Sequence, residues 1–159
     1  MKKMRLFLSA LAASAVLFAC SDDDDNGGSQ TSGNIEARWN PTKTVVEVGG
    51  EDFTQNYDLN EAGCPKDYIE FADPNTLSYV IYFKNASNEC TPDAGDTGTW
   101  TKNDNTLIID GITVGGDDIS GTYEIVRLTG SELRIRTSNT TGGITTTATV
   151  YFTKATNQN

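Results

Sequence analysis

Apolar and polar residues alternate with a period of two along most of the chain from residue 35 onward. In the clearest stretch, Leu77, Tyr79, Ile81 and Phe83 place four large apolar side chains on one face of a strand. Such alternation is typical of strands with one buried face, and no segment after residue 20 keeps its apolar residues at the 3.6-residue spacing of a helix. The pattern therefore predicts an all-β domain.

Eight or nine short strands are expected, separated by turn signals such as Asp73-Pro74-Asn75. Their expected ranges are 35–39, 44–48, 68–71, 77–84, 98–101, 107–109, 121–128, 131–138 and 144–153, with a loop over 85–96. Short strands at this regular spacing are expected of an all-β barrel or sandwich.

The last third of the chain predicts a specific hairpin. Two strands turn at Thr129-Gly130, and Ile125 and Ile135 must share the buried face. That register sets Glu124 opposite Arg136 on the solvent face, where opposite charges stabilise the pair modestly.

The N-terminal segment has a different pattern. Lys2, Lys3 and Arg5 precede an uncharged apolar run over residues 6–19, which is shorter than the roughly 20 residues of a membrane span but suits a signal peptide. The run ends in Leu17-Phe18-Ala19-Cys20, which resembles the lipobox of bacterial lipoproteins. That resemblance implies a signal peptide over 1–19 and acyl chains, palmitate among them, on Cys20, which would anchor the protein in a membrane. The alternative is a secretory signal in which Cys20 is incidental.

Residues 20–33 are expected to form a tether after the lipidated cysteine. Four aspartates at 22–25 repel one another, and the Gly- and Ser-rich residues that follow favour flexible chain. Ser21-Asp22-Asp23-Asp24 also resembles the lipoprotein export signal of Bacteroidota. This implies the outer face of the outer membrane, at the cell surface, with the periplasmic face as the alternative.

Composition narrows the chemistry. The 159 residues carry 12 Lys+Arg against 22 Asp+Glu, a net charge of -10, and include no histidine. The missing histidine excludes Ser-His-Asp and Cys-His nucleophiles and His-ligated zinc. An acidic chain is also a poor binder of nucleic acid, because phosphate contacts need clustered Lys and Arg.

Two cysteines besides Cys20 remain, Cys64 and Cys90. In an exported protein two such residues most simply form a disulfide. A zinc or redox pair is the weaker alternative, because there is no CxxC spacing and no histidine to complete a metal site.

An ordered set of motifs resembles the lipocalin-like domain common in Bacteroidota lipoproteins. The motifs are Cys64-Pro65-Lys66-Asp67-Tyr68-Ile69-Glu70-Phe71, Cys90, Gly98-Thr99-Trp100, Thr106-Leu107-Ile108-Ile109, Tyr123-Glu124-Ile125-Val126-Arg127-Leu128 and Ser131-Glu132-Leu133-Arg134-Ile135. Many members open with a Gly-x-Trp strand, of which this chain has only Trp39, so the pairing before Asp58 stays open. The resemblance implies a lipocalin-like domain over 34–155, a small antiparallel up-and-down β-barrel of about eight strands with one end that could admit an apolar ligand.

The candidate ligand-binding residues are the large aromatics expected inside the barrel. They are Trp39, Tyr79, Phe83, Trp100, Tyr123 and Phe152. An eight-stranded barrel either fills with side chains or holds one small ligand, so plain core packing is the alternative role for these residues. With a filled barrel, the protein would be a surface module that contacts protein or glycan through the Thr-rich last strand.

Other chemistry is less favoured. The acidic loops around Asp93, Asp96, Asp104 and Asp117-Asp118 could offer calcium a few oxygen ligands, but they lack a calcium-loop motif and are expected to be solvated. A pair of catalytic carboxylates needs no histidine, yet nothing in the sequence places two across one cleft. We therefore expect a binding module that is not an enzyme and uses no metal or cofactor.

Overall fold

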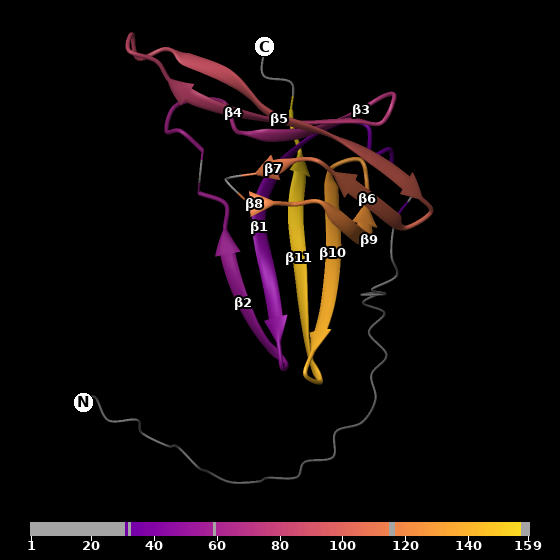
Figure 1. Cartoon of the computed structure of the whole chain (residues 1–159). Helices are drawn as coiled ribbons and strands as arrows, with labels where there is room; N and C mark the ends of the chain where they lie inside the picture. The colour runs from indigo at the N-terminus through magenta and orange to yellow at the C-terminus, as the bar shows by residue number, and fades with distance from the viewer. Residues whose placement is uncertain (1–30, 32, 59, 115–116, 157–159) are drawn as a thin grey trace, which may run out of the picture.

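The computed structural model describes residues 31, 33–58, 60–114 and 117–156 (Figure 1). In these ranges the chain forms strands and no helix. The strands are β1 (Arg38–Val48), β2 (Glu51–Asn56), β3 (Tyr68–Ala72), β4 (Thr76–Lys84), β5 (Cys90–Asn103), β6 (Thr106–Asp110), β7 (Thr113–Val114), β8 (Asp117–Asp118), β9 (Gly121–Leu128), β10 (Glu132–Thr141) and β11 (Ile144–Lys154).

Eight of these strands close into an antiparallel barrel. Their order around the ring is β1-β3-β4-β5-β6-β9-β10-β11, and β11 pairs back onto β1 over Trp39–Val48. Successive ring strands are neighbours, so the topology is up-and-down. β2 adds to β1 outside the ring, while β7 and β8 form a separate ribbon in the β6–β9 connection. The expected small up-and-down β-barrel is confirmed.

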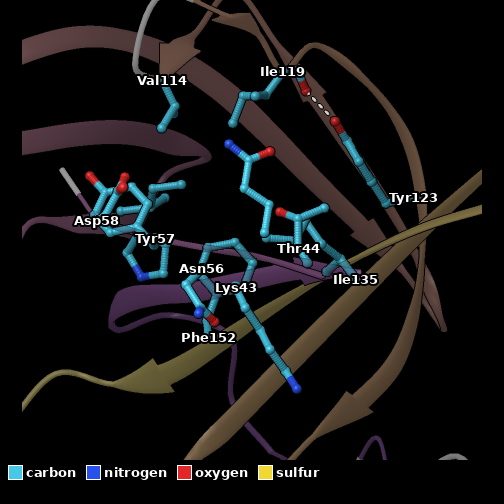
Figure 2. Close-up of a pocket in the computed structure, with 14 residues that line it drawn as sticks. Lys43, Thr44, Asn56, Tyr57, Asp58, Val114, Ile119, Tyr123, Ile135 and Phe152 are labelled. Carbon is cyan, nitrogen blue, oxygen red and sulfur yellow. Dashed lines mark hydrogen bonds between the residues drawn. The ribbon is translucent and has the colours of Figure 1, made fainter. Parts of the chain in front are cut away.

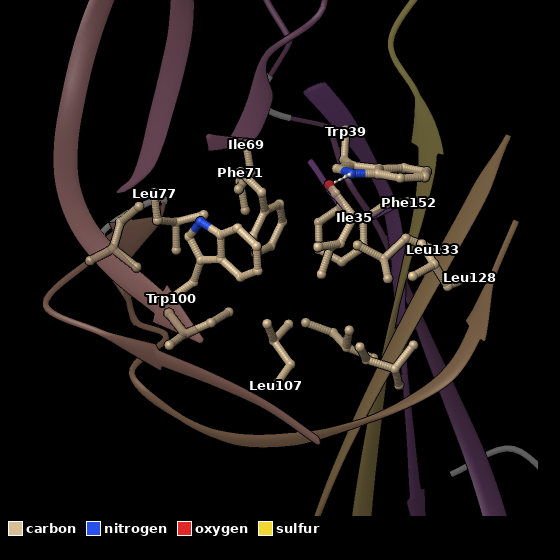
Figure 3. Packing of buried hydrophobic residues seen from close by; sticks show 14 of the residues in the cluster. Ile35, Trp39, Ile69, Phe71, Leu77, Trp100, Leu107, Leu128, Leu133 and Phe152 are labelled. Carbon is tan, nitrogen blue, oxygen red and sulfur yellow. Dashed lines mark hydrogen bonds between the residues drawn. The ribbon is translucent and has the colours of Figure 1, made fainter. Parts of the chain in front are cut away.

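The core fills one half of the barrel. Trp39 is fully buried, and its indole Nε1 donates a hydrogen bond to the Ile35 carbonyl at 2.8 Å. Phe71 and Trp100 meet edge to face with ring centroids 5.6 Å apart (Figure 3). The other fully buried apolar side chains are Leu77, Leu107, Ile112, Ile125, Leu128 and Leu133. Packing of these side chains fills the interior at this end of the barrel.

Both ends of the barrel segment leave at this closed end. The Gly33 amide donates to the Leu128 carbonyl at 3.2 Å, and the Ala155 amide donates to the Arg38 carbonyl at 2.8 Å. Along β10 the chain runs from buried Leu133 past Ile135 to the wholly exposed segment 137–141, so the opposite end of the barrel is the more open one.

A four-stranded sheet projects beyond the open end. β2, β1, β11 and β10 continue past the other ring strands as a long blade (Figure 1). Every residue of β2 is exposed, and Phe53 and Ile144 on this blade are 57% and 58% exposed. The blade is held by strand pairing and little burial.

The predicted β9–β10 hairpin is confirmed. Ile125 pairs with Ile135, and Glu124 pairs with Arg136, whose guanidinium Nη2 lies 2.7 Å from Glu124 Oε2. Apolar alternation and charge were sufficient to predict the register of this hairpin, because one of its faces is buried and the other is exposed to solvent.

Three strand expectations were wrong. Residues 35–39 and 44–48 were expected as separate strands, but β1 is continuous from Arg38 and absorbs an irregularity between Pro41 and Lys43. β2 was not expected, because a strand exposed on both faces has no apolar alternation. The expected 85–96 loop is largely strand, because β5 begins at Cys90 and pairs antiparallel with β4, from Cys90 opposite Lys84 to Thr99 opposite Thr76.

In the part of the chain that the structure describes, no helix has the length and apolarity to cross a membrane. The expected signal peptide over 1–19, Cys20 and the tether as far as residue 30 lie outside the described residues.

Candidate functional site

A cavity of about 330 Å³ lies at the open end of the barrel (Figure 2). Its lining residues are Pro41, Lys43, Thr44, Gln55, Asn56, Tyr57, Asp58, Ile69, Val114, Ile119, Tyr123, Ile135, Val150 and Phe152. A volume of this size is within the range of small-molecule sites, which are mostly apolar with a few polar groups.

The floor and walls of the cavity are apolar. Ile135 and Val150 pair across β10 and β11 and present their side chains to the interior, while Phe152 connects the cavity to the core below. Val114 and Ile119 come from the β7–β8 ribbon and the residue that follows it. The ribbon is held back onto the chain by a hydrogen bond of 3.1 Å from the Ile119 amide to the Ile112 carbonyl.

The polar side of the cavity comes from the end of β2 and the residues after it. Gln55, Asn56, Tyr57 and Asp58 all lie in the lining. The Tyr57 amide donates to the Thr42 carbonyl at 2.9 Å, at the irregularity in β1. Departure of the chain from β1 at this point brings Tyr57 to the barrel mouth.

A buried carboxylate fixes this polar side. Asp67 is 1% exposed, and its two oxygens accept hydrogen bonds from Tyr57 Oη and from the Tyr82 amide, both at 2.8 Å. The Tyr57 hydroxyl is also hydrogen-bonded to the Tyr79 hydroxyl. A hydroxyl has one proton, and that of Tyr57 goes to Asp67, so Tyr79 donates to Tyr57.

Backbone contacts complete the Asp67 network. The Asp67 amide donates to Asn60 Oδ1 at 2.9 Å, and the buried Asn40 side chain donates to the Asp67 carbonyl at 2.8 Å. Buried polar groups must be satisfied, and this network satisfies Asp67 while it fastens the β2–β3 connection over the barrel wall.

The tyrosines at the site keep their protons. Burial raises the pKa of Tyr57, and the hydrogen bond that Tyr57 donates to the Asp67 carboxylate raises that pKa further. Burial also raises the pKa of Tyr79. Desolvation and the charge of Asp118 raise the pKa of Tyr123, whose hydroxyl donates to the Ile119 carbonyl at 2.6 Å. None of these tyrosines is therefore a base near neutral pH.

The disulfide between Cys64 and Cys90 is present, as expected. It joins the β2–β3 connection to the start of β5 with a Cα–Cα distance of 5.5 Å. The same connection carries Tyr57 and Asp58, so the disulfide and the Asp67 network together hold one wall of the cavity.

Family comparison agrees with this geometry. A family described as the lipocalin-like domain matches residues 35–135 of the chain. The chain belongs to the lipocalin-like family. No curated protein matches it. A lipocalin-like barrel with an open apolar cavity is suited to binding a small ligand.

The six aromatics proposed from sequence are divided among three environments in the lipocalin-like barrel. Tyr123 and Phe152 line the cavity, while Trp39, Tyr79 and Trp100 are buried in the core. Phe83 is 41% exposed near the end of β4, where β4 and β5 project as a hairpin (Figure 1). The structure therefore does not bring the six together at one site, and ligand contact by any of them stays a prediction.

Most of the cavity lining was missed by sequence reasoning. Gln55, Asn56 and Asp58 belong to a polar stretch with no strand signal, and Val114 and Ile119 flank a Gly-Gly-Asp-Asp segment that gave no apolar alternation. The apolar period did identify Ile135, but only as core.

The acidic loops form no recognisable cation site in the described ranges, where no group of three or more His, Cys, Asp or Glu could hold a metal ion. Asp118 instead accepts a hydrogen bond from the Ser120 amide at 2.8 Å, and the Ser120 side chain together with this amide lowers the pKa of Asp118. In the lipocalin-like barrel this aspartate closes a local turn.

Proposed function

We propose that this lipocalin-like protein binds one small apolar ligand in the open-end cavity and carries out no reaction. The observation that carries the proposal is the cavity itself, apolar at its floor through Ile69, Ile135, Val150 and Phe152 and polar at its mouth. A barrel of eight strands has room for one such ligand. The absence of histidine from the sequence and the raised pKa values of the site tyrosines support a binding role.

Neighbouring residues on β11 allow a matched test of ligand binding. Val150 faces the cavity, whereas Thr149 points to the opposite face of the same strand, because successive side chains alternate. Val150→Trp fills the cavity, and Thr149→Trp adds the same side chain outside it. Fluorescence titration with Nile red, a neutral apolar probe, should show binding to the wild type and to Thr149→Trp, with at least a ~10-fold loss in Val150→Trp.

Equal Nile red affinity in the two variants would show that the probe binds elsewhere and would contradict the proposal. In that case the alternative, a surface module that contacts protein or glycan, would be favoured. The outward threonines of β10 and β11 are its candidate surface, with hydroxyl pairs Ser138–Thr147 at 3.1 Å and Thr140–Thr145 at 3.0 Å. The empty volume at the open end favours the ligand-binding role.

The proposal includes export and lipid anchoring through Cys20. The support is the lipobox-like Leu17-Phe18-Ala19-Cys20 after a basic n-region. Two or three acyl chains hold a domain on a membrane stably, since each buried CH₂ contributes roughly 0.8 kcal/mol. Detergent-phase partitioning of the full chain expressed in a bacterium should place the wild type in the detergent phase and Cys20→Ala in the aqueous phase. The wild type in the aqueous phase would contradict the anchor.

We propose that the protein is located at the outer membrane and displayed at the cell surface. The support is the acidic Ser21-Asp22-Asp23-Asp24 segment directly after Cys20. Protease treatment of intact cells should remove the domain, with a periplasmic protein as the protected control. Protection of the domain in intact cells, with digestion after lysis, would indicate the periplasmic face instead.

A further inference from the structure

We propose that the cavity selects its ligand by charge, accepting a neutral or positively charged polar end and rejecting a carboxylate or phosphate. This inference rests on the proposed ligand binding and specifies the class of ligand. Two observations support it: the charges around the cavity are mostly negative, and the tyrosine hydroxyls of its wall already donate their protons to groups of the protein.

The tyrosines of the lining have no proton to offer an anion. Tyr57 donates its proton to Asp67 Oδ2 at 2.8 Å, and Tyr123 donates its proton to the Ile119 carbonyl at 2.6 Å. Binding of a carboxylate or phosphate depends on donors directed at its oxygens. Thr44, Gln55 and Asn56 carry groups that can donate or accept, so they do not discriminate between ligand charges.

The carboxylates near the cavity come from three parts of the chain. Asp58 is in the lining itself, Asp67 accepts a hydrogen bond from the Tyr57 hydroxyl directly behind the lining, and Asp118 immediately precedes the lining residue Ile119. Like charges repel more strongly where water is displaced, so an anionic ligand is disfavoured and a cation is favoured.

The cations of the described residues do not offset these charges inside the cavity. Lys43 is in the lining, but its ammonium lies 4.7 Å from the centroid of the Tyr151 ring on the outer face. Figure 2 shows its Nζ pointing away from the other labelled side chains. Arg134 and Arg136 on neighbouring β10 are paired with Glu132 and Glu124, also outside.

Three ligands with the same decyl chain test the inference: decylammonium, decan-1-ol and decanoate. Isothermal titration of the intact protein, at low salt and below the micelle concentration of each ligand, should give at least ~10-fold tighter binding of decylammonium than of decanoate, with decan-1-ol between them. The ratio should fall as salt is added, because Asp58 is exposed to screening.

Charge-neutralising variants locate the effect. Asp58→Asn should reduce the decylammonium-to-decanoate ratio several-fold. Asp104→Asn removes the same charge at the β5–β6 turn, where the φ of 50° suits Asn, and should leave the ratio unchanged. Asp67→Asn should reduce the ratio as well. Because Asp58 lies on an exposed loop, its variant tests the inference even if Asp67→Asn fails to fold.

Decylammonium could also bind to the acidic surface of the protein. Val150→Trp separates the two kinds of binding, because it fills the cavity and should abolish the preference for decylammonium over decanoate. Persistence of the preference in that variant would overturn the inference, as would equal affinities for decylammonium and decanoate in the wild type. Equal affinities would leave the proposed ligand binding intact. Failure of all three ligands to bind would overturn the proposed function and this inference with it.

Discussion

Trp39 is the residue whose burial contributes most clearly to the closed end of the barrel. It is 0% exposed, and its indole N–H is satisfied by the Ile35 carbonyl. Truncation leaves a large void and an unpaired carbonyl. We predict that Trp39→Ala lowers the free energy of unfolding by about 3–5 kcal/mol.

Urea denaturation followed by circular dichroism measures this change. Phe53→Ala is the matched control, because Phe53 is 57% exposed on the blade and its loss should change stability by less than about 0.5 kcal/mol. A similar loss of unfolding free energy in the two variants would contradict the prediction, because it would show that exposed Phe53 stabilises the domain as much as buried Trp39.

Glu132 gives the domain a predictable pH dependence. Burial raises the pKa of Glu132, but the hydrogen bond from Arg134 and the charges of Arg134 and Arg127, each with an Nε at 2.6 Å, outweigh it and lower the pKa below the ordinary 4.5. A lowered folded-state pKa stabilises the fold at pH values above 4.5, and this contribution is lost as the pH falls through the folded value.

We therefore predict that wild type is more stable than Glu132→Gln at pH 6 and that the difference shrinks below pH ~4. Urea denaturation at a series of pH values measures the difference. The exposed Glu51 on β2 supplies the control variant Glu51→Gln, which should show little change with pH. A difference for Glu132→Gln that is constant between pH 6 and 3 would contradict the assignment.

At the scale of elements, Gly98 allows β5 to pass close to the chain that leaves β6. A Cβ built on Gly98 would lie 2.3 Å from the Asp110 carbonyl oxygen and 3.1 Å from the Gly111 carbonyl carbon. Backbone atoms cannot rotate away as a side chain can. We predict that Gly98→Ala lowers the free energy of unfolding by about 1–3 kcal/mol.

Gly130 in the β9–β10 turn is the control for that substitution, because a Cβ there meets nothing within 4 Å. Thermal unfolding of Gly98→Ala and Gly130→Ala compares the two positions. Equal melting temperatures would show that the β5–β6 crossing can relax at little cost.

The Cys64–Cys90 disulfide links two elements separated by 26 positions in sequence. On the chain-entropy account, loss of a link over such a loop lowers the free energy of unfolding by about 3–4 kcal/mol. We predict this loss for the double variant Cys64→Ala/Cys90→Ala in urea denaturation. Wild type unfolded in the presence of a reductant should match the variant, and unchanged stability in both would contradict the prediction.

Sequence patterns predicted those elements in which burial differs between the two faces. In the β9–β10 hairpin, Ile125 and Ile135 are inside and Glu124 and Arg136 are outside, so period and charge fix the register. β2 has no buried face, and the N-terminal half of β5 is paired through backbone while its side chains are mostly polar and exposed. A strand held only by backbone hydrogen bonds shows no alternation of apolar and polar residues, so the sequence does not reveal it.

At the scale of the whole molecule, the barrel and the blade should differ in local stability. Residues 51–56 and 137–141 are exposed throughout, whereas β3 and β6 alternate with buried positions. Segments with little apolar burial open more readily. We predict that amide hydrogen exchange, followed by mass spectrometry, is faster in these two blade segments than in β3 and β6. Equal protection along β10 from Leu133 to Thr141 would contradict this.

The cavity itself could not be predicted from the sequence. Its lining combines β1, β10 and β11 with Gln55, Asn56 and Asp58, which come together only through the irregularity near Pro41 and the Asp67 network. Single-strand alternation gives the inner face of each strand but not how deeply side chains fill the ring. The sequence therefore indicated a barrel with aromatics inside, and four of the six proposed aromatics, Trp39, Tyr79, Trp100 and Phe152, belong to the buried core.

The position of the two ends of the barrel segment, Gly33 and Ala155, at the closed end bears on how a ligand reaches the cavity. Gly33 and Ala155 both leave beside Leu128 and Arg38, while the cavity opens at the far end. If Cys20 carries the proposed lipid, the closed end is the one tethered to the bilayer, and a domain that rests on the membrane by this end has its entrance facing away from the bilayer. Ligand would then be exchanged with the aqueous phase or with a docked carrier rather than drawn sideways out of the membrane. Without a carrier, an apolar molecule would then pass between the bilayer and the cavity through water. The rate of this transfer should therefore increase with the aqueous solubility of the ligand.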